Sequence, residues 1–265
     1  MAATADRHTL YEHSVQSIDA EYEFIDDIYR KTHKRKAFTL REDFCGTASM
    51  CCEWVRQRRK NTAFGVDLDD EVLAWGKANN VDKLKPAQQQ RIQLIQGDVM
   101  RSKVAPVDVV VAMNFSYQIF KTRALLRKYF KRARTGLVDD GIFIMDVFGG
   151  YEAYREIEEE TEHDNFTYIW DQAKYNPVTG DITCHIHFAF PDKSIMEKAF
   201  TYEWRLWTLP ELQELLVEAG FNKVTVYCQE FDEDGEPDGD FSSVTEIDAD
   251  AGWIAYIVAE QAVVT

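Results

Sequence analysis

Short apolar runs alternate with amphipathic segments between residues 37 and 147. Over residues 122–137 apolar side chains recur at spacings of four, three and four, which predicts a helix with one buried face. Strands separated by helices are typical of βαβ units around a parallel sheet, so this part of the chain predicts an α/β fold. The apolar runs predict strands at residues 37–42, 62–66, 92–96, 107–112 and 141–147.

The pattern changes after residue 150, where aromatic and β-branched runs are separated by turn-forming Asn, Pro and Gly residues. Such runs predict an antiparallel sheet inserted into the α/β fold over residues 151–207. The insert would serve either as a lid over a site or as an interface with a second copy of the chain. Its strands are expected at residues 168–175, 181–190 and 197–205.

The last part of the chain, from residue 208 on, again predicts a helix followed by strands. A helix is expected to begin after Thr208, which forms a capping box with Glu211, and to end at Gly220. Two strands follow, at residues 223–229 and 252–260. The acidic connection between them, residues 230–250, is expected to be a solvated loop.

The chain has 265 residues, which suits a single domain over residues 1–265 with an N-terminal helical segment at residues 1–36. Its 46 acidic and 30 basic residues give a net charge of −16, which opposes binding to nucleic acid. The longest apolar stretch, residues 107–113, is far shorter than the ~20 residues that cross a bilayer. The first residues do not resemble a secretory signal, so we expect a cytoplasmic protein that does not bind membranes.

Five cysteines occur without a CxxC spacing, which favours reduced thiols over disulfides or a zinc site. His185 and His187 share one face of a predicted strand, but a third ligand at a recognisable spacing is missing. We expect both histidines to pack or face solvent, and we expect no metal.

A candidate ligand-binding turn follows the first predicted strand, where residues 40–48 read Leu-Arg-Glu-Asp-Phe-Cys-Gly-Thr-Ala. Gly46 turns the backbone and a helix is expected from Thr47, so free backbone amides would face a ligand. A dinucleotide site would need three glycines, and a phosphate loop would need a lysine followed by Ser or Thr. NAD is therefore disfavoured, and ATP bound through that motif is excluded.

Acidic residues follow the second and third predicted strands. Asp67 lies 21 residues after Gly46, where a carboxylate can accept hydrogen bonds from both hydroxyls of a ribose. Asp98 could accept a hydrogen bond from an adenine amine. Taken singly, such acids are more often helix caps than ligands. Their order and spacing, without a basic residue for phosphates, favour a cationic nucleoside over a nucleotide.

Residues 37–148 resemble the class I S-adenosylmethionine-dependent methyltransferases, in a branch whose first motif reads close to Glu-Asp-Phe-Cys-Gly-Thr, and are similar to small-molecule enzymes of the glycine N-methyltransferase type. The resemblance implies S-adenosyl-L-methionine as cofactor and a three-layer Rossmann-like fold, with a seven-stranded, mostly parallel sheet whose last strand is antiparallel. The sequence departs from the family at Phe44 and Ala48, where glycine is usual. The implied cofactor-binding residues are Glu42, Phe44 and Gly46 at the methionine end, Asp67 and Leu68 at the ribose and adenine, and Asp98 and Val99 at the adenine edge.

In that family the segment after the fourth strand faces the methyl group, and here it reads Met-Asn-Phe-Ser-Tyr over residues 113–117. Asn114 and Tyr117 are candidate catalytic residues that would orient the nucleophile, and Met113 is a candidate cofactor contact. Relatives that methylate nucleic-acid bases carry two prolines here, and this chain carries neither. Base methylation is therefore not expected.

Two further regions could contribute to the site. Tyr11 is a candidate cofactor contact, because residues 11–17 either close over the cofactor or form the entry to a surface helix. Arg205 lies in an aromatic run of the insert and is a candidate for binding a substrate carboxylate.

These features predict an enzyme that transfers a methyl group from S-adenosyl-L-methionine to a nitrogen or oxygen of a small molecule, with a homodimer as one arrangement. Two alternatives stay open. A methyltransferase of protein side chains would need an open groove, and a non-catalytic cofactor-binding or scaffold protein would use the insert as a dimer interface. The sequence does not identify the acceptor.

Overall fold

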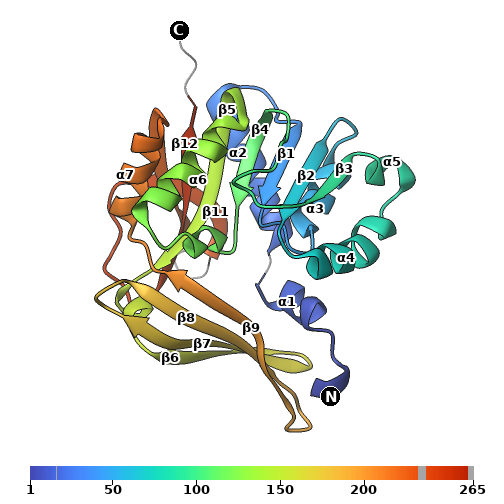
Figure 1. Cartoon of the computed structure of the whole chain (residues 1–265), viewed down its shortest axis with the longest axis vertical. Helices are drawn as coiled ribbons and strands as arrows, with labels where there is room; N and C mark the ends of the chain where they lie inside the picture. The colour runs from blue at the N-terminus through green and yellow to red at the C-terminus, as the bar shows by residue number, and fades with distance from the viewer. Residues whose placement is uncertain (16, 232–236, 262–265) are drawn as a thin grey trace.

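The computed structural model describes residues 1–15, 17–231 and 237–261. It contains an eight-stranded sheet and a separate four-stranded sheet. Figure 1 shows the larger sheet between helices in the upper part of the molecule, and the smaller sheet below it beside α1.

The larger sheet is mostly parallel. β1 pairs in parallel with β2 and β4, and the same sense continues from β2 to β3 and from β4 to β5. β12 runs antiparallel between β5 and β10, which confirms the predicted α/β fold with an antiparallel last strand. In the order across the sheet, the strands are β11 (Pro237–Val244), β10 (Lys223–Phe231), β12 (Trp253–Glu260), β5 (Leu137–Gly149), β4 (Val107–Ala112), β1 (Thr39–Asp43), β2 (Thr62–Asp67) and β3 (Ile92–Gln96).

Helices cover both faces of this sheet. α2 buries Tyr22, Ile25 and Ile28 against one face, together with α3, while α6 and α7 pack on the other. Leu137, expected on the buried face of α6, is instead the first residue of β5, because the helix ends at Gly136. The helices are α1 (Arg7–Val15), α2 (Ile18–His33), α3 (Ser49–Gln57), α4 (Asp70–Asn79), α5 (Pro86–Gln89), α6 (Arg123–Thr135) and α7 (Leu209–Ala219), with short 3₁₀ turns at Ala2–Thr4, Val81–Lys83, Ser116–Ile119 and Tyr151–Tyr154.

The smaller sheet is antiparallel, as predicted for the insert, but it has four strands rather than three. Its first strand, β6, is an exposed edge strand rich in glutamate, a residue of low strand propensity, so the sequence pattern does not show it. Charges on an edge also oppose pairing with another chain. The strands are β6 (Ile157–His163), β7 (Phe166–Asn176), β8 (Asp181–Ala189) and β9 (Ile195–Arg205).

β11 corrects the expectation of a solvated loop over residues 230–250 and makes the larger sheet eight-stranded rather than seven-stranded. The strand has the polar sequence Pro-Asp-Gly-Asp-Phe-Ser-Ser-Val, without the alternation that predicts a strand. It forms because the edge of β10 offers backbone partners, from Val226 opposite Val244 to Phe231 opposite Pro237. The part of the expected loop at residues 232–236 lies outside the described residues.

The N-terminal segment, residues 1–15, links the two sheets and is called the strap below. The ring of His8 packs between Trp75 of α4 and Phe200 of β9, at centroid distances of 5.2 and 5.7 Å. The Trp75 indole N–H also donates to the carboxylate of Asp6 at 2.9 Å. The strap therefore bridges the large sheet's helical layer and the antiparallel sheet, as Figure 1 shows near the N-terminus.

Over the described ranges, none of the helices combines the length and the apolar character needed to span a membrane. Within the same residues, His, Cys, Asp and Glu side chains do not gather in groups of three or more suited to a metal ion. All five cysteines are free thiols.

Candidate active site

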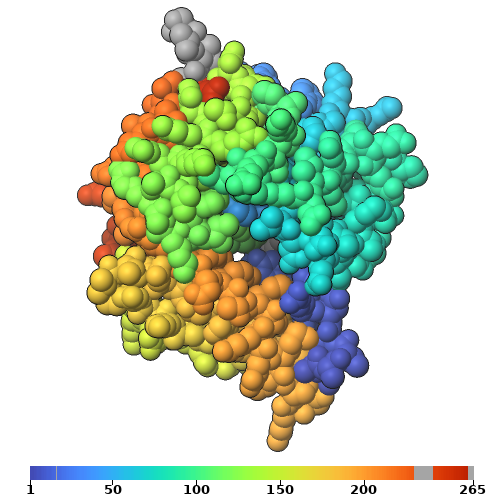
Figure 2. Space-filling view, in the orientation of Figure 1, coloured from blue at the N-terminus to red at the C-terminus, as the bar shows by residue number. Residues whose placement is uncertain are grey.

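The carboxyl ends of neighbouring strands bring several predicted cofactor residues to one edge of the large sheet. Glu42 lies near the end of β1, Asp67 ends β2, and Asp98 follows β3 by two residues. The strand order reverses between β1 and β4, and ligands of open α/β sheets bind outside the carboxyl ends at such a point. Figure 2 shows the surface hollowed between this part of the molecule and the antiparallel sheet.

The turn after β1 contains three residues in the left-handed region, Phe44 (φ 61°), Gly46 (φ 51°) and Ala48 (φ 59°). Ala48 therefore delays α3, which begins at Ser49 rather than at Thr47. A side chain added at Gly46 would meet no heavy atom within 4 Å, so this side of the turn faces open space. The turn offers backbone to a ligand with a single glycine, Gly46.

Asp67 connects this turn to β2. Its Oδ2 accepts a hydrogen bond from the Gly46 N–H at 2.8 Å, and its Oδ1 accepts one from the Asp69 N–H at 3.0 Å. Burial raises the pKa of Asp67, although these backbone hydrogen bonds oppose the rise. Each oxygen keeps acceptor capacity for a hydroxyl group of a ligand. The neighbouring Leu68 is 72% exposed, and its apolar side chain is left uncovered beside the carboxylate.

A buried ion pair supports the same turn from the core. The Arg41 guanidinium donates to both carboxylate oxygens of Asp43, at 2.8 and 2.7 Å, and the Tyr129 hydroxyl donates to the same carboxylate at 3.0 Å. Arg41 is 2% exposed. The ring of Phe44 packs on Tyr129 and Phe120, at centroid distances of 5.6 and 6.1 Å. These contacts fix the turn on α6, and the role of Phe44 at a methionine chain stays a prediction.

Glu42 and Asp98 differ in their surroundings. Glu42 is buried and accepts a hydrogen bond from the Cys51 N–H at 3.1 Å, and burial raises its pKa to about 7. Asp98 is partly exposed, accepts the Met100 N–H at 2.8 Å and lies 3.6 Å from Arg101. Asp98 therefore caps its own turn, as many strand-end acids do, and keeps one side open to solvent.

Val99 and Met113 are both buried. Val99 follows β3 and Met113 follows β4, so they lie on opposite sides of β1 and β2 in the sheet. Their expected contacts with the cofactor stay predictions.

Asp146 of β5 is a site residue that the sequence analysis missed. Its carboxylate accepts hydrogen bonds from the N–H groups of Asn114 and Phe115, at 2.7 and 2.9 Å. Both of these residues are left-handed, with φ values of 56° and 57°. Burial raises the pKa of Asp146 to about 7. The sequence does carry a signal for this residue. Asp146 directly follows the apolar run of β5, as Asp67 follows that of β2.

Of the two candidate catalytic residues, one lies at the start of this turn and the other lies just after it. Asn114 begins the turn that Asp146 holds, so its backbone position is fixed. Tyr117 is fully buried, and its hydroxyl has no hydrogen-bond partner within the part of the chain that the structure describes. Burial raises its pKa well above the ordinary value, and the charge of Asp146 adds to the rise. Roles for both residues in orienting a nucleophile stay predictions.

The strap contacts the start of α3 and the end of α4 through Glu12. One oxygen of this carboxylate accepts hydrogen bonds from the Ser49 hydroxyl at 2.7 Å and from the Asn80 amide at 2.6 Å. Next to it, Tyr11 packs on Phe200 of β9 at a centroid distance of 5.1 Å. Burial raises the pKa of Tyr11, with further contributions from neighbouring tyrosines and Asp146. This placement favours a segment that closes over the site.

Arg205 is held by protein groups. Its guanidinium lies 3.7 Å from the centre of the Trp207 ring and donates to Glu211 of α7 at 3.1 Å and to the Lys121 carbonyl at 3.4 Å. These contacts link β9 to α7, and binding of a substrate carboxylate stays a prediction. On β8, His185 bonds Thr201 at 3.0 Å and His187 contacts Asp171 at 3.4 Å.

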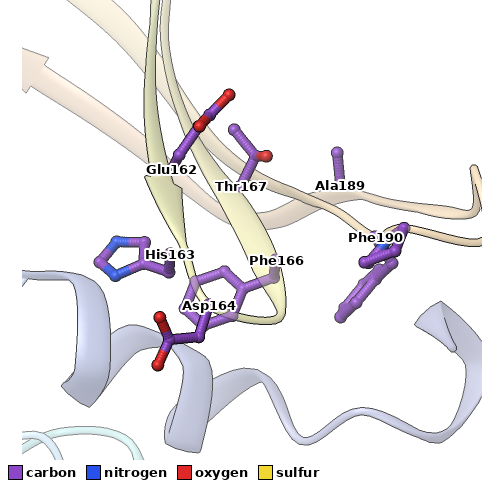
Figure 3. A pocket seen from close by; sticks show the side chains of 8 residues that line it. Glu162, His163, Asp164, Phe166, Thr167, Ala189 and Phe190 are labelled. Atoms are coloured by element: carbon purple, nitrogen blue, oxygen red, sulfur yellow. The ribbon is translucent and has the colours of Figure 1, made fainter.

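A surface hollow at the far end of the antiparallel sheet contains none of the predicted site residues. Figure 3 shows it at the turn between β6 and β7, with Asp164 and the rings of Phe166 and Phe190 in the lower part of the view and Glu162 and Thr167 in the upper part. His163 stacks on Phe166 at a centroid distance of 4.7 Å. The hollow is a feature of the hairpin end.

Comparisons with known proteins give a structural result only. No family model matches the chain, and no curated protein matches it. Among solved structures, the chain is similar to an S-adenosylmethionine-dependent methyltransferase from Clostridium acetobutylicum ATCC 824, with a TM-score of 0.70, 14% identity, and coverage of 96% of this chain and 97% of the other.

Two further solved structures are similar over nearly their whole length. DesVI of Streptomyces venezuelae has a TM-score of 0.68, 17% identity, and coverage of 96% and 98%. An amino pentose methyltransferase from Micromonospora echinaspora, solved with S-adenosylmethionine bound, has a TM-score of 0.66, 14% identity, and coverage of 96% and 95%.

The fold is that of S-adenosylmethionine-dependent methyltransferases. This result agrees with the Rossmann-like architecture that the sequence resemblance implies. At these identities the likeness concerns the fold, so the activity has to be argued from the site.

Proposed function

We propose that this chain transfers a methyl group from S-adenosyl-L-methionine to a nucleophile of a small molecule bound between the two sheets. The observation that carries the proposal is the arrangement of Gly46, Asp67 and Leu68. An open turn, a carboxylate bonded to it and an uncovered apolar side chain lie at one strand end. The open turn would contact the methionine end of the cofactor, the carboxylate its ribose, and the apolar side chain its adenine.

Under this proposal, residues from three strands hold the cofactor. Asp67 accepts hydrogen bonds from the ribose hydroxyls, and Leu68 packs on the adenine face. Asp98, which is partly exposed, accepts from the adenine amine. Glu42 is buried at the end of β1, where it would compensate the positive methionine end.

The bound cofactor supplies a methyl group on a sulfonium, which is already an excellent leaving group. The protein therefore has to align the nucleophile and exclude water. Asp146 contributes by fixing the turn that carries Asn114, and Tyr117 follows within the same turn. The strap contributes by closing over the site, where Glu12 joins it to the start of α3 and the end of α4.

The position of the antiparallel sheet supports a small-molecule acceptor. Phe148, at the end of β5, packs on Phe115 at 4.8 Å and on Trp170 of β7 at 6.5 Å between ring centroids. The inserted sheet thus lies against the strand ends, whereas a protein substrate would need an open groove. The amino pentose methyltransferase with the same fold has a small-molecule acceptor in its name, which agrees with this choice.

The proposal also covers the acceptor atom, the cellular location and the oligomeric state. The acceptor atom is nitrogen or oxygen, and the sequence resembles that of enzymes of the glycine N-methyltransferase type. The protein would work in the cytoplasm without nucleic acid, since a net charge of −16 opposes polyanions. A homodimer would use faces of the inserted sheet that do not meet the site.

Calorimetry of the purified chain with S-adenosylmethionine, S-adenosylhomocysteine and NAD tests the proposal. We expect the first two to bind at roughly micromolar Kd and NAD not to bind. Failure of folded, ligand-free protein to bind either sulfur compound would overturn it. Slow formation of S-adenosylhomocysteine with generic acceptors would separate an enzyme from a binding protein, which would show none.

A further inference from the structure

Glu21 is a buried carboxylate on the apolar face of α2. It continues the stripe formed by Ile25 and Ile28, at positions i, i+4 and i+7, and is 9% exposed. Within the described residues its carboxylate has neither a hydrogen bond nor an ion pair. A buried charge without a partner is costly, so a position of this kind needs an explanation.

α2 lies over β12 near Glu21, because the ring of Phe24, one helical turn after Glu21, packs on the ring of Tyr256 at a centroid distance of 4.6 Å. Asp146 of β5 lies opposite Tyr256 of β12, and Glu42 of β1 lies opposite Val111 of β4. Val111 in turn pairs with Ile144, two residues before Asp146. These residues therefore share the face of the sheet that α2 covers.

Glu21, Glu42 and Asp146 together form what we call the acidic cluster. Burial, together with the charges of Asp146 and Glu42, raises the pKa of Glu21 to about 8. Tyr256 faces the cluster from β12; burial raises its pKa, and Glu21 and Asp146 add to the rise. The two charged groups that act on Glu21, Asp146 and Glu42, are thus both acidic, and among the described residues Glu21 forms no ion pair.

We propose that Glu21 recognises the methyl acceptor and that the acceptor is an amine, which Glu21 binds as an ammonium group. The inference rests on the proposed function, since it names the substrate class of the same site. An alcohol would bring no positive charge to the acidic cluster, and a carboxylate would be repelled by it. Burial disfavours the charged form of Glu21, and a bound ammonium group would stabilise that form.

The position of Glu21 separates this role from the binding of ribose and adenine. The residues proposed for ribose and adenine lie at the ends of β2 and β3, whereas Asp146 and Tyr256 lie on β5 and β12, on the other side of β1 and β4. Asp146 already accepts two backbone N–H groups, so it shapes the site and adds negative potential. Of the three acids in the cluster, Glu21 is therefore the one that we assign to ligand binding.

The transfer step balances with this assignment. The ammonium gives one proton to the Glu21 carboxylate, which frees the nitrogen lone pair. That pair forms the new bond to the methyl carbon while the carbon–sulfur bond breaks and leaves its electrons on sulfur. The products are the methylated ammonium ion and S-adenosylhomocysteine, and the proton on Glu21 returns to solvent.

Calorimetry on the full chain saturated with S-adenosylhomocysteine tests the inference with matched probes. Benzylamine and benzyl alcohol have the same ring and differ in charge, and the aromatic groups around Phe115, Phe148 and Trp170 suit the ring. We expect the amine to bind more tightly than the alcohol by at least about tenfold, and Glu21→Gln to abolish this preference. The control is Glu23→Gln, an exposed glutamate on the same helix, which should keep it.

A second readout does not depend on any acceptor. If Glu21 served the fold, Glu21→Gln would lower the Tm of the ligand-free protein. We expect an equal or higher Tm at pH 8, because the variant removes an uncompensated buried acid. A Tm lowered by more than that of Glu23→Gln would contradict the inference.

The outcomes separate the two proposals. If S-adenosylhomocysteine fails to bind the wild type, the proposed function falls. If it binds but benzylamine is not preferred, or if Glu21→Gln keeps the preference, the amine inference is wrong while the function stands. A loss of S-adenosylhomocysteine affinity beyond about tenfold in Glu21→Gln would place Glu21 at the cofactor and also overturn the inference.

Discussion

The backbone N–H of Gly46 donates a hydrogen bond to the Asp67 carboxylate at 2.8 Å and so ties the turn after β1 to the end of β2. The turn and the carboxylate would contact different parts of the same nucleoside. Their separation is therefore set before a ligand arrives, which reduces the ordering that binding has to supply.

Replacement of Asp67 by alanine should greatly weaken cofactor binding. The change removes the acceptor for two ribose hydroxyls and also the bond to Gly46. Charged hydrogen bonds of this kind contribute about 3 kcal/mol together, so we expect Kd for S-adenosylmethionine to rise roughly 100-fold in calorimetry. The control Asp70→Ala removes an exposed acid three residues away and should leave Kd unchanged. Unchanged affinity in Asp67→Ala would remove this residue from the site.

Replacement of Asp43 by alanine should strongly destabilise the protein. Arg41 would remain buried without its bidentate partner, and the Tyr129 hydroxyl would lose its acceptor. Breaking such a pair on one side costs about 3–5 kcal/mol in the free energy of unfolding. Urea denaturation would measure it, with Tyr129→Phe as the milder comparison at about 1 kcal/mol. Equal losses in the two variants would show that the ion pair does not support the turn.

β4 was predictable because its burial on both faces leaves a nearly continuous apolar run. β6 and β11 were not, because each is held by the edge of a neighbouring strand and carries polar or acidic side chains. An edge strand needs its partner's backbone more than an apolar face of its own. An edge strand is therefore hard to predict from the local sequence.

Stability should fall as pH rises from about 5 to 8, and Glu42→Gln should reduce the fall. Glu42 has a pKa of about 7 in the folded chain against an ordinary value of 4.5, because burial disfavours its charge. Between these values the folded state binds more protons than the unfolded state. The contribution is complete below the ordinary pKa and is lost as pH rises through about 7.

Thermal unfolding of both proteins across this range measures the effect. Glutamine keeps an oxygen that can accept the Cys51 N–H, so the fold should survive the change. A Tm difference between wild type and Glu42→Gln that does not vary with pH would contradict the assignment of a raised pKa to this residue.

Release of the strap should speed cofactor dissociation. Glu12→Ala removes the acceptor shared by Ser49 and Asn80, which joins the strap to α3 and the end of α4. The loss of two hydrogen bonds corresponds to about 2 kcal/mol, so we expect the dissociation rate of S-adenosylhomocysteine to rise roughly 30-fold. Stopped-flow competition would measure the rate. An unaltered rate would mean that the strap does not cover the bound cofactor.

The site was predictable in part. Gly46 and Asp67 were found because glycine and acid follow apolar runs at a recognisable spacing, and the structure joins them by a hydrogen bond. Glu21 could not be found by motif, since its burial depends on how α2 packs on the sheet. Glu21 does share a helical stripe with Ile25 and Ile28. This position indicates a buried acid only once the whole stripe is known to be buried.

A crystal structure of the chain with S-adenosylhomocysteine tests the central claim most directly. We expect ribose hydroxyls on the Asp67 carboxylate, adenine against Leu68, and a sulfur atom that faces the turn held by Asp146. Binding of the nucleoside elsewhere on the chain, or with its sulfur turned away from that turn, would contradict it.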